Sequence, residues 1–116
     1  TPLLEEAKRQ IAAYFAGDLE AFDLPLEYRC SDFQRQSCEE MLKIPYGETI
    51  TYAELASRLG SSAQAAGNAC GGNPLPIVVP CHRVLGSGNL GGYSGEGGIE
   101  TKVALLKMES SVPWLI

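Results

Sequence analysis

The pair Cys81-His82 carries the most chemistry in the sequence. Cysteine reacts as the thiolate, and with an ordinary pKa of about 8.5 it is mostly protonated at neutral pH. His82 is the only histidine of the 116 residues, and it could take that proton directly or through water. A downstream carboxylate could orient the ring, and the candidates are Glu96, Glu100 and Glu109. The pair predicts nucleophilic chemistry, with a buried structural thiol as the alternative, because neighbouring side chains of an extended segment point to opposite faces.

The amino-acid composition is that of an ordinary globular protein. Apolar residues make up 45% of the chain and charged residues 20%, and no apolar run approaches the length that spans a bilayer. The length suits one hydrophobic core. No secretory signal opens the sequence, so we expect a cytoplasmic protein with free thiols and no membrane partner. Four cysteines without a C-x-x-C pair, and a single histidine, predict no metal site.

Charge is distributed unevenly along the chain. The formal net charge is −5; residues 1–50 hold ten acidic and five basic residues, whereas residues 51–116 hold four of each. The half that contains Cys81 is therefore neutral. This balance permits a modest contact with DNA but gives no strong electrostatic attraction to it.

The N-terminal segment predicts a helix followed by a connector. Thr1 is a plausible N-cap before Pro2, and Gly17 is a natural stop. Apolar residues recur at helical spacing and predict one buried face, formed by Leu4, Ala7, Ile11 and Phe15. Residues 18–30 alternate acidic and apolar residues and predict an extended connector. We therefore divide the chain into an N-terminal helix and connector, residues 1–30, and a main domain, residues 31–116.

Two longer helices are predicted in the main domain. Ser31 and Gln34 have the spacing of a capping box, which begins a helix that continues to Lys43. Its predicted core face consists of Phe33, Cys38, Met41 and Leu42. The last helix should run over residues 99–110, with an inner face of Ile99, Val103 and Leu106.

Two shorter helices are predicted between them. Thr51 and Glu54 repeat the capping-box spacing and begin a helix over residues 52–59. Ser61 and Gln64 give the spacing again and begin a helix over residues 63–70. Two short helices joined by a glycine-containing turn have the form of a helix-turn-helix. The second helix consists mostly of small residues, which suit either close approach to a partner or tight helix packing.

The reactive pair lies between an apolar run and a glycine-rich segment. Asn73-Pro74 predicts a turn, residues 75–79 lead into Cys81, and residues 86–98 contain seven glycines. The glycine segment is either a surface connection or a loop shaped around a ligand, with Tyr93 as an aromatic wall. We therefore expect a mainly α fold: a winged-helix-like helix-turn-helix domain with short extended segments.

The sequence around the reactive pair resembles that of a known family. The segment Pro80-Cys81-His82-Arg83-Val84, with residues 73–79 before it, is similar to the active-site signature of the O6-alkylguanine-DNA alkyltransferases, also called methylated-DNA–protein-cysteine methyltransferases. Further matching motifs are IPYGET at residues 44–49, TYAELA at residues 51–56 and GGYSG at residues 91–95. The resemblance covers roughly residues 31–110.

The resemblance implies a DNA repair protein that flips an alkylated guanine out of double-stranded DNA and moves the alkyl group onto its own cysteine, once per molecule. It implies that Cys81 is the acceptor, that His82 activates it through a bound water, and that Glu109 orients His82. Asn73 would brace the site, and Tyr52 would donate a proton to the departing base. The residues expected to line the substrate pocket are Tyr93, Ser94, Val84 and Lys102. No metal or organic cofactor is required, and we expect a monomer.

The resemblance also places the second short helix in the minor groove of DNA. The residues expected to contact DNA are Ala63, Gln64, Ala65, Gly67, Asn68 and Arg83. Family members usually carry an arginine at the position of Gln64, inserted into the duplex in place of the flipped base. Gln64 would either keep a weakened form of that role or serve only as the capping partner of Ser61. In a bacterium such a protein would be associated with the nucleoid.

Two other functions stay open. The first is damage recognition without transfer, as in the alkyltransferase-like proteins, which usually have tryptophan in place of the cysteine. Cys81 favours transfer, whereas the missing arginine favours recognition alone. The second is a Cys-His hydrolase on another fold, although the sequence has no legible oxyanion-hole signature.

Overall fold

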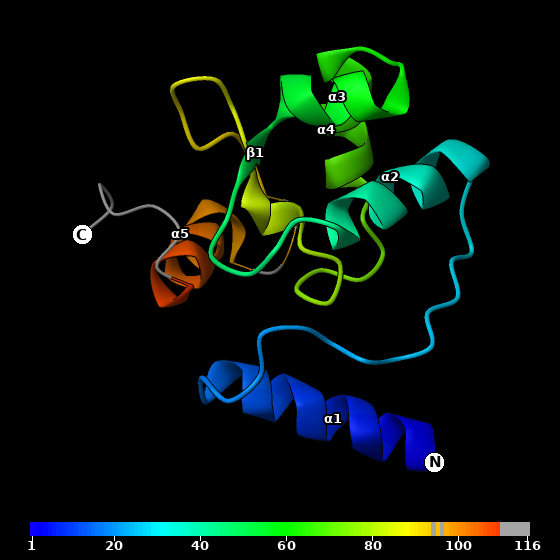
Figure 1. The fold of residues 1–116 in the computed structure, drawn as a ribbon, viewed down its shortest axis with the longest axis vertical. Helices are drawn as coiled ribbons and strands as arrows, with labels where there is room; N and C mark the ends of the chain where they lie inside the picture. The colour runs from blue at the N-terminus through cyan, green and yellow to red at the C-terminus, as the bar shows by residue number, and fades with distance from the viewer. Residues whose placement is uncertain (94, 96, 110–116) are drawn as a thin grey trace.

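The computed structural model describes residues 1–93, 95 and 97–109. Over these residues the fold is mainly helical with two very short strands, which confirms the predicted fold class (Figure 1). In chain order the elements are α1 (Pro2–Phe15), α2 (Asp32–Leu42), β1 (Ile50–Thr51), α3 (Tyr52–Leu59), α4 (Ala63–Gly71), the 3-10 helix η1 (Cys81–Arg83), β2 (Val84–Leu85) and α5 (Gly98–Met108). Within the described ranges no helix is long and apolar enough to cross a membrane.

The hydrophobic core lies between α2, α3, α4 and the segment that leads into η1. Its fully buried members include Met41 from α2, Leu55 from α3, Ala66 from α4 and Val79 just before η1. Cys81 belongs to the same cluster. Because a close-packed core resists displacement, this packing holds the chain firmly on the N-terminal side of the reactive pair.

The two strands hold the chain on the other side of the pair. β1 and β2 run parallel, with Ile50 beside Val84 and Thr51 beside Leu85. β1 leads directly into α3, and β2 follows directly after η1. The short sheet therefore ties the start of the two short helices to the segment that carries the cysteine.

Helices α3 and α4 form the predicted helix-turn-helix. The capping box at the start of α3 is complete, because the Thr51 hydroxyl accepts from the Glu54 backbone N–H at 3.1 Å and the Glu54 carboxylate accepts from the Thr51 backbone N–H. Gly60 ends α3 in the left-handed conformation at φ 64°, which glycine adopts without strain.

The cap of α4 differs from the prediction by one residue. Ser62, not Ser61, is the N-cap, and its hydroxyl accepts from the backbone N–H of Ala65 at 3.1 Å. The backbone N–H of Ser61 instead bonds the carbonyl of Ala56 at 2.9 Å and so still belongs to the end of α3. The proposed capping role of Gln64 is therefore wrong.

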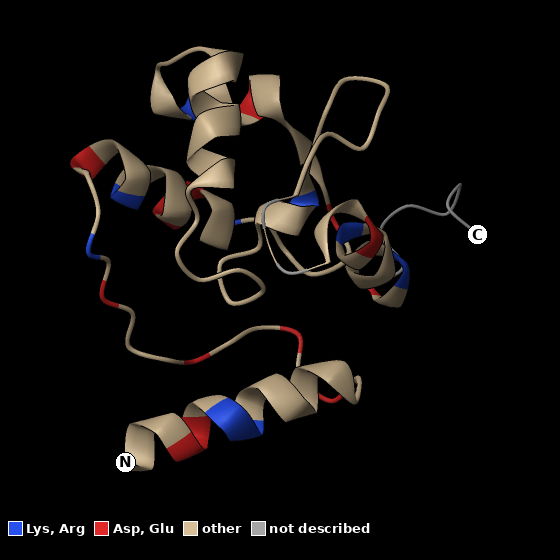
Figure 2. Ribbon diagram, turned by 180° about the vertical axis from the view of Figure 1, so that it is seen from behind, with Lys and Arg blue, Asp and Glu red and all other residues tan. Residues whose placement is uncertain are grey.

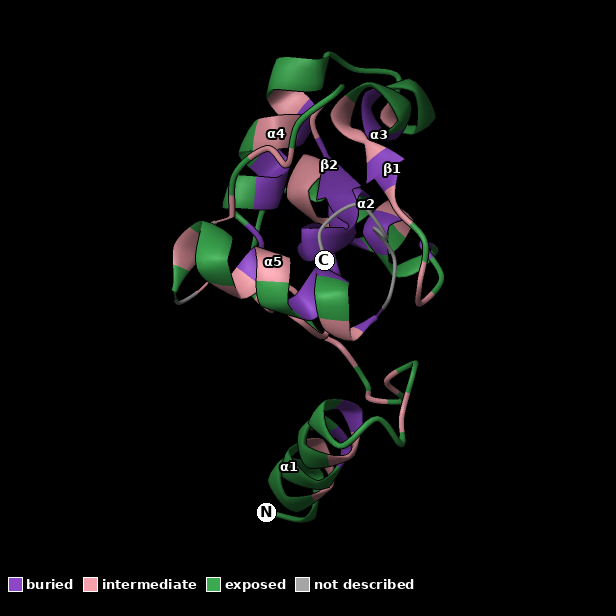
Figure 3. Cartoon of the chain, turned by 90° about the vertical axis from the view of Figure 1, so that its left-hand side faces the viewer, coloured by how far each residue is buried: buried purple, intermediate pink, exposed green. Residues whose placement is uncertain are grey.

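Helix α1 buries a different face from the one predicted. Its apolar stripe is largely exposed, with Leu4 at 52% and Phe15 at 51% of their full exposure, and Figure 3 shows most of α1 facing solvent. The buried residues are Gln10 and Tyr14. The Gln10 side chain makes two hydrogen bonds of 2.8 Å with the backbone of Asp23, so the connector docks on the polar face of the helix.

The predicted inner faces of two other helices also need correction. In α2, Cys38 and Met41 are buried as expected, but Leu42 is exposed. In α5 the buried residues are Lys102, Leu105 and Leu106, whereas Ile99 is exposed; the predicted end of this helix at Ser110 lies outside the described residues. The inner face of α5 therefore includes a lysine and does not coincide with the face that the apolar pattern predicted.

The segment before Cys81 is a turn rather than an extended run. The backbone N–H of Val79 bonds the carbonyl of Leu75 at 2.9 Å, and Ile77 adopts a φ of 78°. A left-handed conformation is uncommon for a β-branched residue and persists where the surrounding packing imposes it. The turn reverses the chain and directs it into η1.

Candidate active site

The 3-10 helix η1 resolves how two neighbouring side chains serve one site. The backbone N–H of Arg83 bonds the carbonyl of Pro80 at 3.0 Å, which closes the turn. Cys81, His82 and Arg83 are all buried. Because successive residues of a 3-10 helix are rotated by about a third of a turn, their side chains do not point to opposite faces as they would in a strand. Both residues are buried, as the alternative reading expected, yet Cys81 also borders a cavity.

Of the three candidate carboxylates, Glu109 is the one beside His82. Its Oε2 lies 2.8 Å from Nε2 of the ring, and both side chains are fully buried. Glu100 lies on the exposed first turn of α5, and Glu96 lies outside the described residues. A carboxylate accepts hydrogen bonds, so Nε2 is the donor in this pair. Nδ1 is buried and bonds no described group.

Glu109 is the centre of a buried network of hydrogen bonds. Arg83 donates from Nε to Oε1 at 2.8 Å and from Nη2 to Oε2 at 3.0 Å, and the Tyr14 hydroxyl also donates to Oε2. Burial alone would raise the pKa of Glu109, but the hydrogen bonds from His82 and Arg83 outweigh it and lower the pKa to about 2. The carboxylate therefore stays charged at any physiological pH.

Arg83 is not placed to contact DNA, contrary to the prediction. Only 6% of the residue is exposed, and its remaining donor Nη1 bonds the carbonyl of Ile44 at 2.8 Å. A buried guanidinium needs a paired carboxylate, and Glu109 provides one. Arg83 therefore holds Glu109 in position.

The Cys81 thiol is buried and protonated at rest. Burial raises its pKa, while the side chain of Asn73 and the charge of Lys102 act in the opposite direction without cancelling the effect. Asn73 also donates to the carbonyl of Val79 at 2.9 Å and accepts from the backbone N–H of Leu75 at 2.9 Å. Asn73 thus braces the turn that leads into Cys81.

Cys81 opens into a cavity of about 280 Å³ between α4 and the glycine segment. The residues that line it are Tyr52, Gly67, Cys70, Gly71, Cys81, Gly92 and Tyr93. A methyl group added to Gly67, Gly71 or Gly92 would meet no protein atom within 4 Å. The absence of side chains at these positions therefore keeps the cavity open, between the rings of the two tyrosines.

Several predicted pocket residues are placed elsewhere. Val84 is fully buried in the core, and Ser94 lies outside the described residues. Lys102 is fully buried, and its ammonium donates to the carbonyls of Val84 at 2.7 Å and Gly92 at 2.9 Å. Lys102 therefore ties the glycine segment to the end of η1 instead of lining the cavity. Its burial lowers its pKa to about 8.

Sequence reasoning missed two residues of the site. Cys70 lines the cavity, and its position three residues after Gly67 on one helix face could have revealed it. Tyr14 reaches the site from α1, and no local pattern indicated that contact. Burial raises the pKa of Cys70 to about 12, so this second thiol is also protonated.

Most of the residues that are predicted to contact DNA lie on the outer surface of α4. Ala63, Gln64 and Asn68 are exposed, and Ala65 and Gly67 are partly exposed. Figure 2 shows α4 without any charged residue, in contrast to the acidic and basic residues on α1 and α2. Attraction of this surface to phosphate groups is therefore weak.

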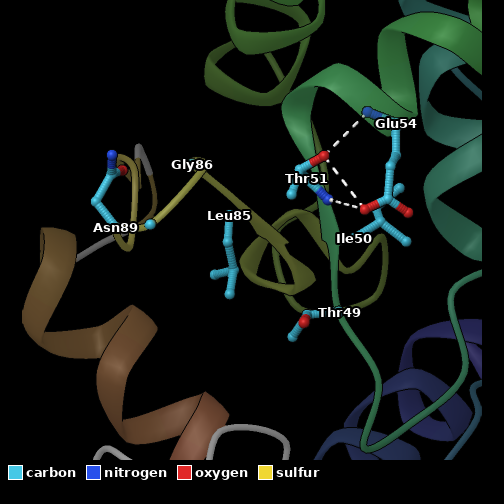
Figure 4. Close-up of a pocket in the computed structure, with 8 residues that line it drawn as sticks. Thr49, Ile50, Thr51, Glu54, Leu85, Gly86 and Asn89 are labelled. Atoms are coloured by element: carbon cyan, nitrogen blue, oxygen red, sulfur yellow. Dashed lines mark hydrogen bonds between the residues drawn. The ribbon is translucent and has the colours of Figure 1, made fainter.

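A larger cavity of about 420 Å³ lies away from the thiol, between β1, the start of α3 and the turn after β2 (Figure 4). Three of its polar side chains are already engaged: Thr51 and Glu54 form the capping box, and Asn89 accepts from the backbone N–H of Gly91 at 2.9 Å. It contains no nucleophile. Among the described residues no cluster of three potential metal ligands occurs.

The chain is similar in sequence to a family of known proteins. The profile described as "6-O-methylguanine DNA methyltransferase, DNA binding domain" matches residues 32–111. A methylated-DNA–protein-cysteine methyltransferase from Mycobacterium bovis is 51% identical over 105 residues, covering 88% of this chain and 62% of the relative. One from Methanosarcina acetivorans is 46% identical over 109 residues, covering 91% of this chain and 69% of the relative.

A solved structure is similar as well. The crystal structure of Mycobacterium tuberculosis OGT in complex with DNA matches with a TM-score of 0.86 and 49% identity, covering 92% of this chain and 66% of that one. The chain spans less than two thirds of the length of the mycobacterial relative from M. bovis.

Proposed function

The chain belongs to the 6-O-methylguanine DNA methyltransferase family, and we propose that it repairs double-stranded DNA by moving an alkyl group from O6-alkylguanine to Cys81. The observation that carries the proposal is a buried Cys81 that lines a cavity of about 280 Å³ and is followed directly by the buried, hydrogen-bonded pair His82 and Glu109. We further propose that residues 31–116 form the family's C-terminal catalytic and DNA-binding domain, that residues 1–30 form a helix and connector, and that the protein acts as a monomer.

Transfer would begin when Cys81 loses its proton to Nδ1 of His82 through a water molecule. Nε2 already donates to Glu109, so Nδ1 is the nitrogen that can accept. Because burial raises the pKa of Cys81, the thiolate would form only with this assistance. The permanent charge of Glu109 would stabilise the imidazolium that results.

The thiolate would then attack the alkyl carbon in line with its bond to O6 of guanine. The C–S bond forms as the C–O bond breaks, and guanine leaves with the electron pair. Tyr52 borders the cavity and would supply a proton to the departing base, to be replaced by the proton held on His82. In balance, guanine gains the proton that Cys81 loses. The thioether is stable, so each molecule would react once.

DNA would bind through α4. Gly67, Cys70 and Gly71 of this helix line the cavity, so a base displaced from the duplex by α4 would enter directly beside Cys81. Gln64, exposed in the first turn of α4, would take the place of the missing arginine in a weakened form. In a bacterium this substrate would bring the protein to the nucleoid.

Mass spectrometry of the intact protein tests the proposal. After incubation with a duplex oligonucleotide that contains O6-methylguanine, we expect a gain of one methyl group, located on Cys81 and absent from Cys81→Ala. Duplex binding without any gain in mass would refute transfer and favour damage recognition alone.

A further inference from the structure

Helix α1 contributes one side chain to the buried network at Glu109. The Tyr14 hydroxyl donates to Oε2, the same oxygen that lies 2.8 Å from Nε2 of His82. Tyr14 is completely buried, although the rest of α1 is mostly exposed. It also lies before residues 32–111, the part of the chain that the family profile matches. The contact spans 95 positions of sequence and links α1 to the candidate active site.

The hydrogen bonds that Glu109 accepts are concentrated on one of its two oxygens. Two carboxylate oxygens offer about four lone-pair positions. Arg83 donates one hydrogen bond to each oxygen, and His82 and Tyr14 both bond Oε2, so three donors compete for about two positions on that oxygen. Tyr14 and His82 therefore share one acceptor, so a change in either bond alters the other.

The ring of Tyr14 is held by other aromatic rings. Its centroid lies 5.3 Å from that of Phe15, 5.4 Å from that of Phe22 and 6.2 Å from that of Tyr46. These contacts fix where the hydroxyl points. Burial and the neighbouring Glu109 raise the pKa of Tyr14, so the hydroxyl remains a donor throughout the physiological range.

We infer that Tyr14 is a positioning residue for alkyl transfer: through Glu109 Oε2, it sets the orientation and the basicity of His82. The inference rests on the proposed function. Without the Tyr14 hydroxyl, Oε2 would lose a donor and carry more negative charge toward His82. The imidazolium would then be held more strongly, and the ring would stay protonated up to a higher pH. Because a protonated ring cannot accept the proton of Cys81, the acid limb of the pH–rate profile would move to higher pH.

The other groups facing Glu109 do not titrate in the range that matters. They are Arg83 from η1 and Tyr46 from the turn before β1, in addition to His82 and Tyr14. Arginine keeps its charge at any physiological pH. Burial raises the pKa of Tyr46, which keeps this tyrosine neutral. A shift of the acid limb would therefore report the coupling through Glu109.

The experiment compares Tyr14→Phe with Tyr46→Phe. Tyr14→Phe keeps the ring in its aromatic cluster and removes the hydroxyl. Tyr46→Phe is the matched control, because it also removes a hydroxyl from this aromatic cluster. The Tyr46 hydroxyl donates to the Met108 carbonyl at 3.4 Å and not to Glu109. Single-turnover methyl transfer is measured from pH 5 to 9. In addition, NMR follows the ring N–H proton of His82, the only histidine of the chain.

We expect Tyr14→Phe to move the acid midpoint up by about half a unit and so to slow transfer about threefold at pH 6.5. The His82 N–H resonance should move downfield, because the ring would bond the carboxylate more strongly. Tyr46→Phe should keep the parental midpoint and resonance. The coupling through Glu109 is tested in the Glu109→Gln background by the His82 resonance, which Tyr14→Phe should shift no further.

An unchanged midpoint and resonance in a folded Tyr14→Phe protein would overturn the inference, as would equal shifts in both variants. If Tyr14→Phe does not fold, the parental protein decides: a Tyr14 hydroxyl proton that exchanges with water as fast as that of an exposed tyrosine would overturn it, and a protected one would support it. Complete absence of transfer in the parental protein would refute the proposed function, and the His82 resonance would still test the Tyr14 contact.

Discussion

Replacing Glu109 by glutamine should destabilise the protein strongly at neutral pH. The substitution keeps the size of the side chain but removes the charge that the buried Arg83 guanidinium requires, and it turns one acceptor into a donor. The pKa of Glu109 is lowered from 4.5 to about 2, and one unit corresponds to about 1.4 kcal/mol. The ionised carboxylate therefore contributes on the order of 3 kcal/mol to the free energy of unfolding.

The contribution of Glu109 has a defined pH window. Because its pKa is lower in the folded protein than in the unfolded chain, the stabilisation is complete above pH 4.5 and is lost as pH falls toward about 2. The difference between the parental protein and Glu109→Gln should accordingly fall from about 3 kcal/mol at pH 7 to about 1 kcal/mol at pH 3.

Urea denaturation at pH 7, 5, 4 and 3 measures this difference. Glu100→Gln is the matched control, because it makes the same replacement on the exposed first turn of the same helix. It should change the free energy of unfolding far less and without this pH window. A loss below about 1 kcal/mol at pH 7 for Glu109→Gln, or a loss that stays constant down to pH 3, would refute the assignment of Glu109 as a buried charge that stabilises the fold.

Two further predictions concern DNA binding and the size of the cavity. Gln64→Arg should tighten duplex binding, steepen its salt dependence and speed transfer, because it adds a cation to the uncharged surface of α4. Fluorescence anisotropy at two salt concentrations measures the binding. A gain in affinity no larger than that of Gln36→Arg, at an exposed position of α2, would show that position 64 has been misassigned. Cys70→Met should slow the transfer of an O6-benzyl group at least about tenfold more than that of a methyl group, since the longer side chain enters the cavity. Equal effects on both substrates would contradict the placement of Cys70 at the wall of the cavity.

The local signals in the sequence were the reliable ones. Thr1, Ser31 and Thr51 cap helices as predicted, because an N-cap depends on residues within one turn of it. The helix-turn-helix followed from two such signals and a glycine. The cap of α4 was displaced by one residue because Ser61 completes the end of α3, a competition that spacing alone does not express.

Burial was harder to predict because it depends on distant parts of the chain. The apolar pattern of α1 indicated Leu4 and Phe15 as its inner face, but the helix docks through Gln10 and Tyr14. Arg83 looked like a DNA contact because cations are usually exposed. Its partner Glu109 lies 26 positions away, and neither residue alone indicates that they form a buried pair.

The burial of Cys81 accounts for the extent of the network around it. For the proposed alkyl transfer, a thiol that is shielded from water would stay unreacted until a substrate base arrives, because the protonated form is a weak nucleophile. The same burial requires a base that is held in one tautomer and a carboxylate that remains charged without water. Glu109 meets both requirements because Arg83 neutralises it and because Arg83, Tyr14 and His82 all bond its Oε2 oxygen. Under the proposed function, α1 would support the site through Tyr14, and Tyr14→Phe should therefore alter the pH dependence of transfer.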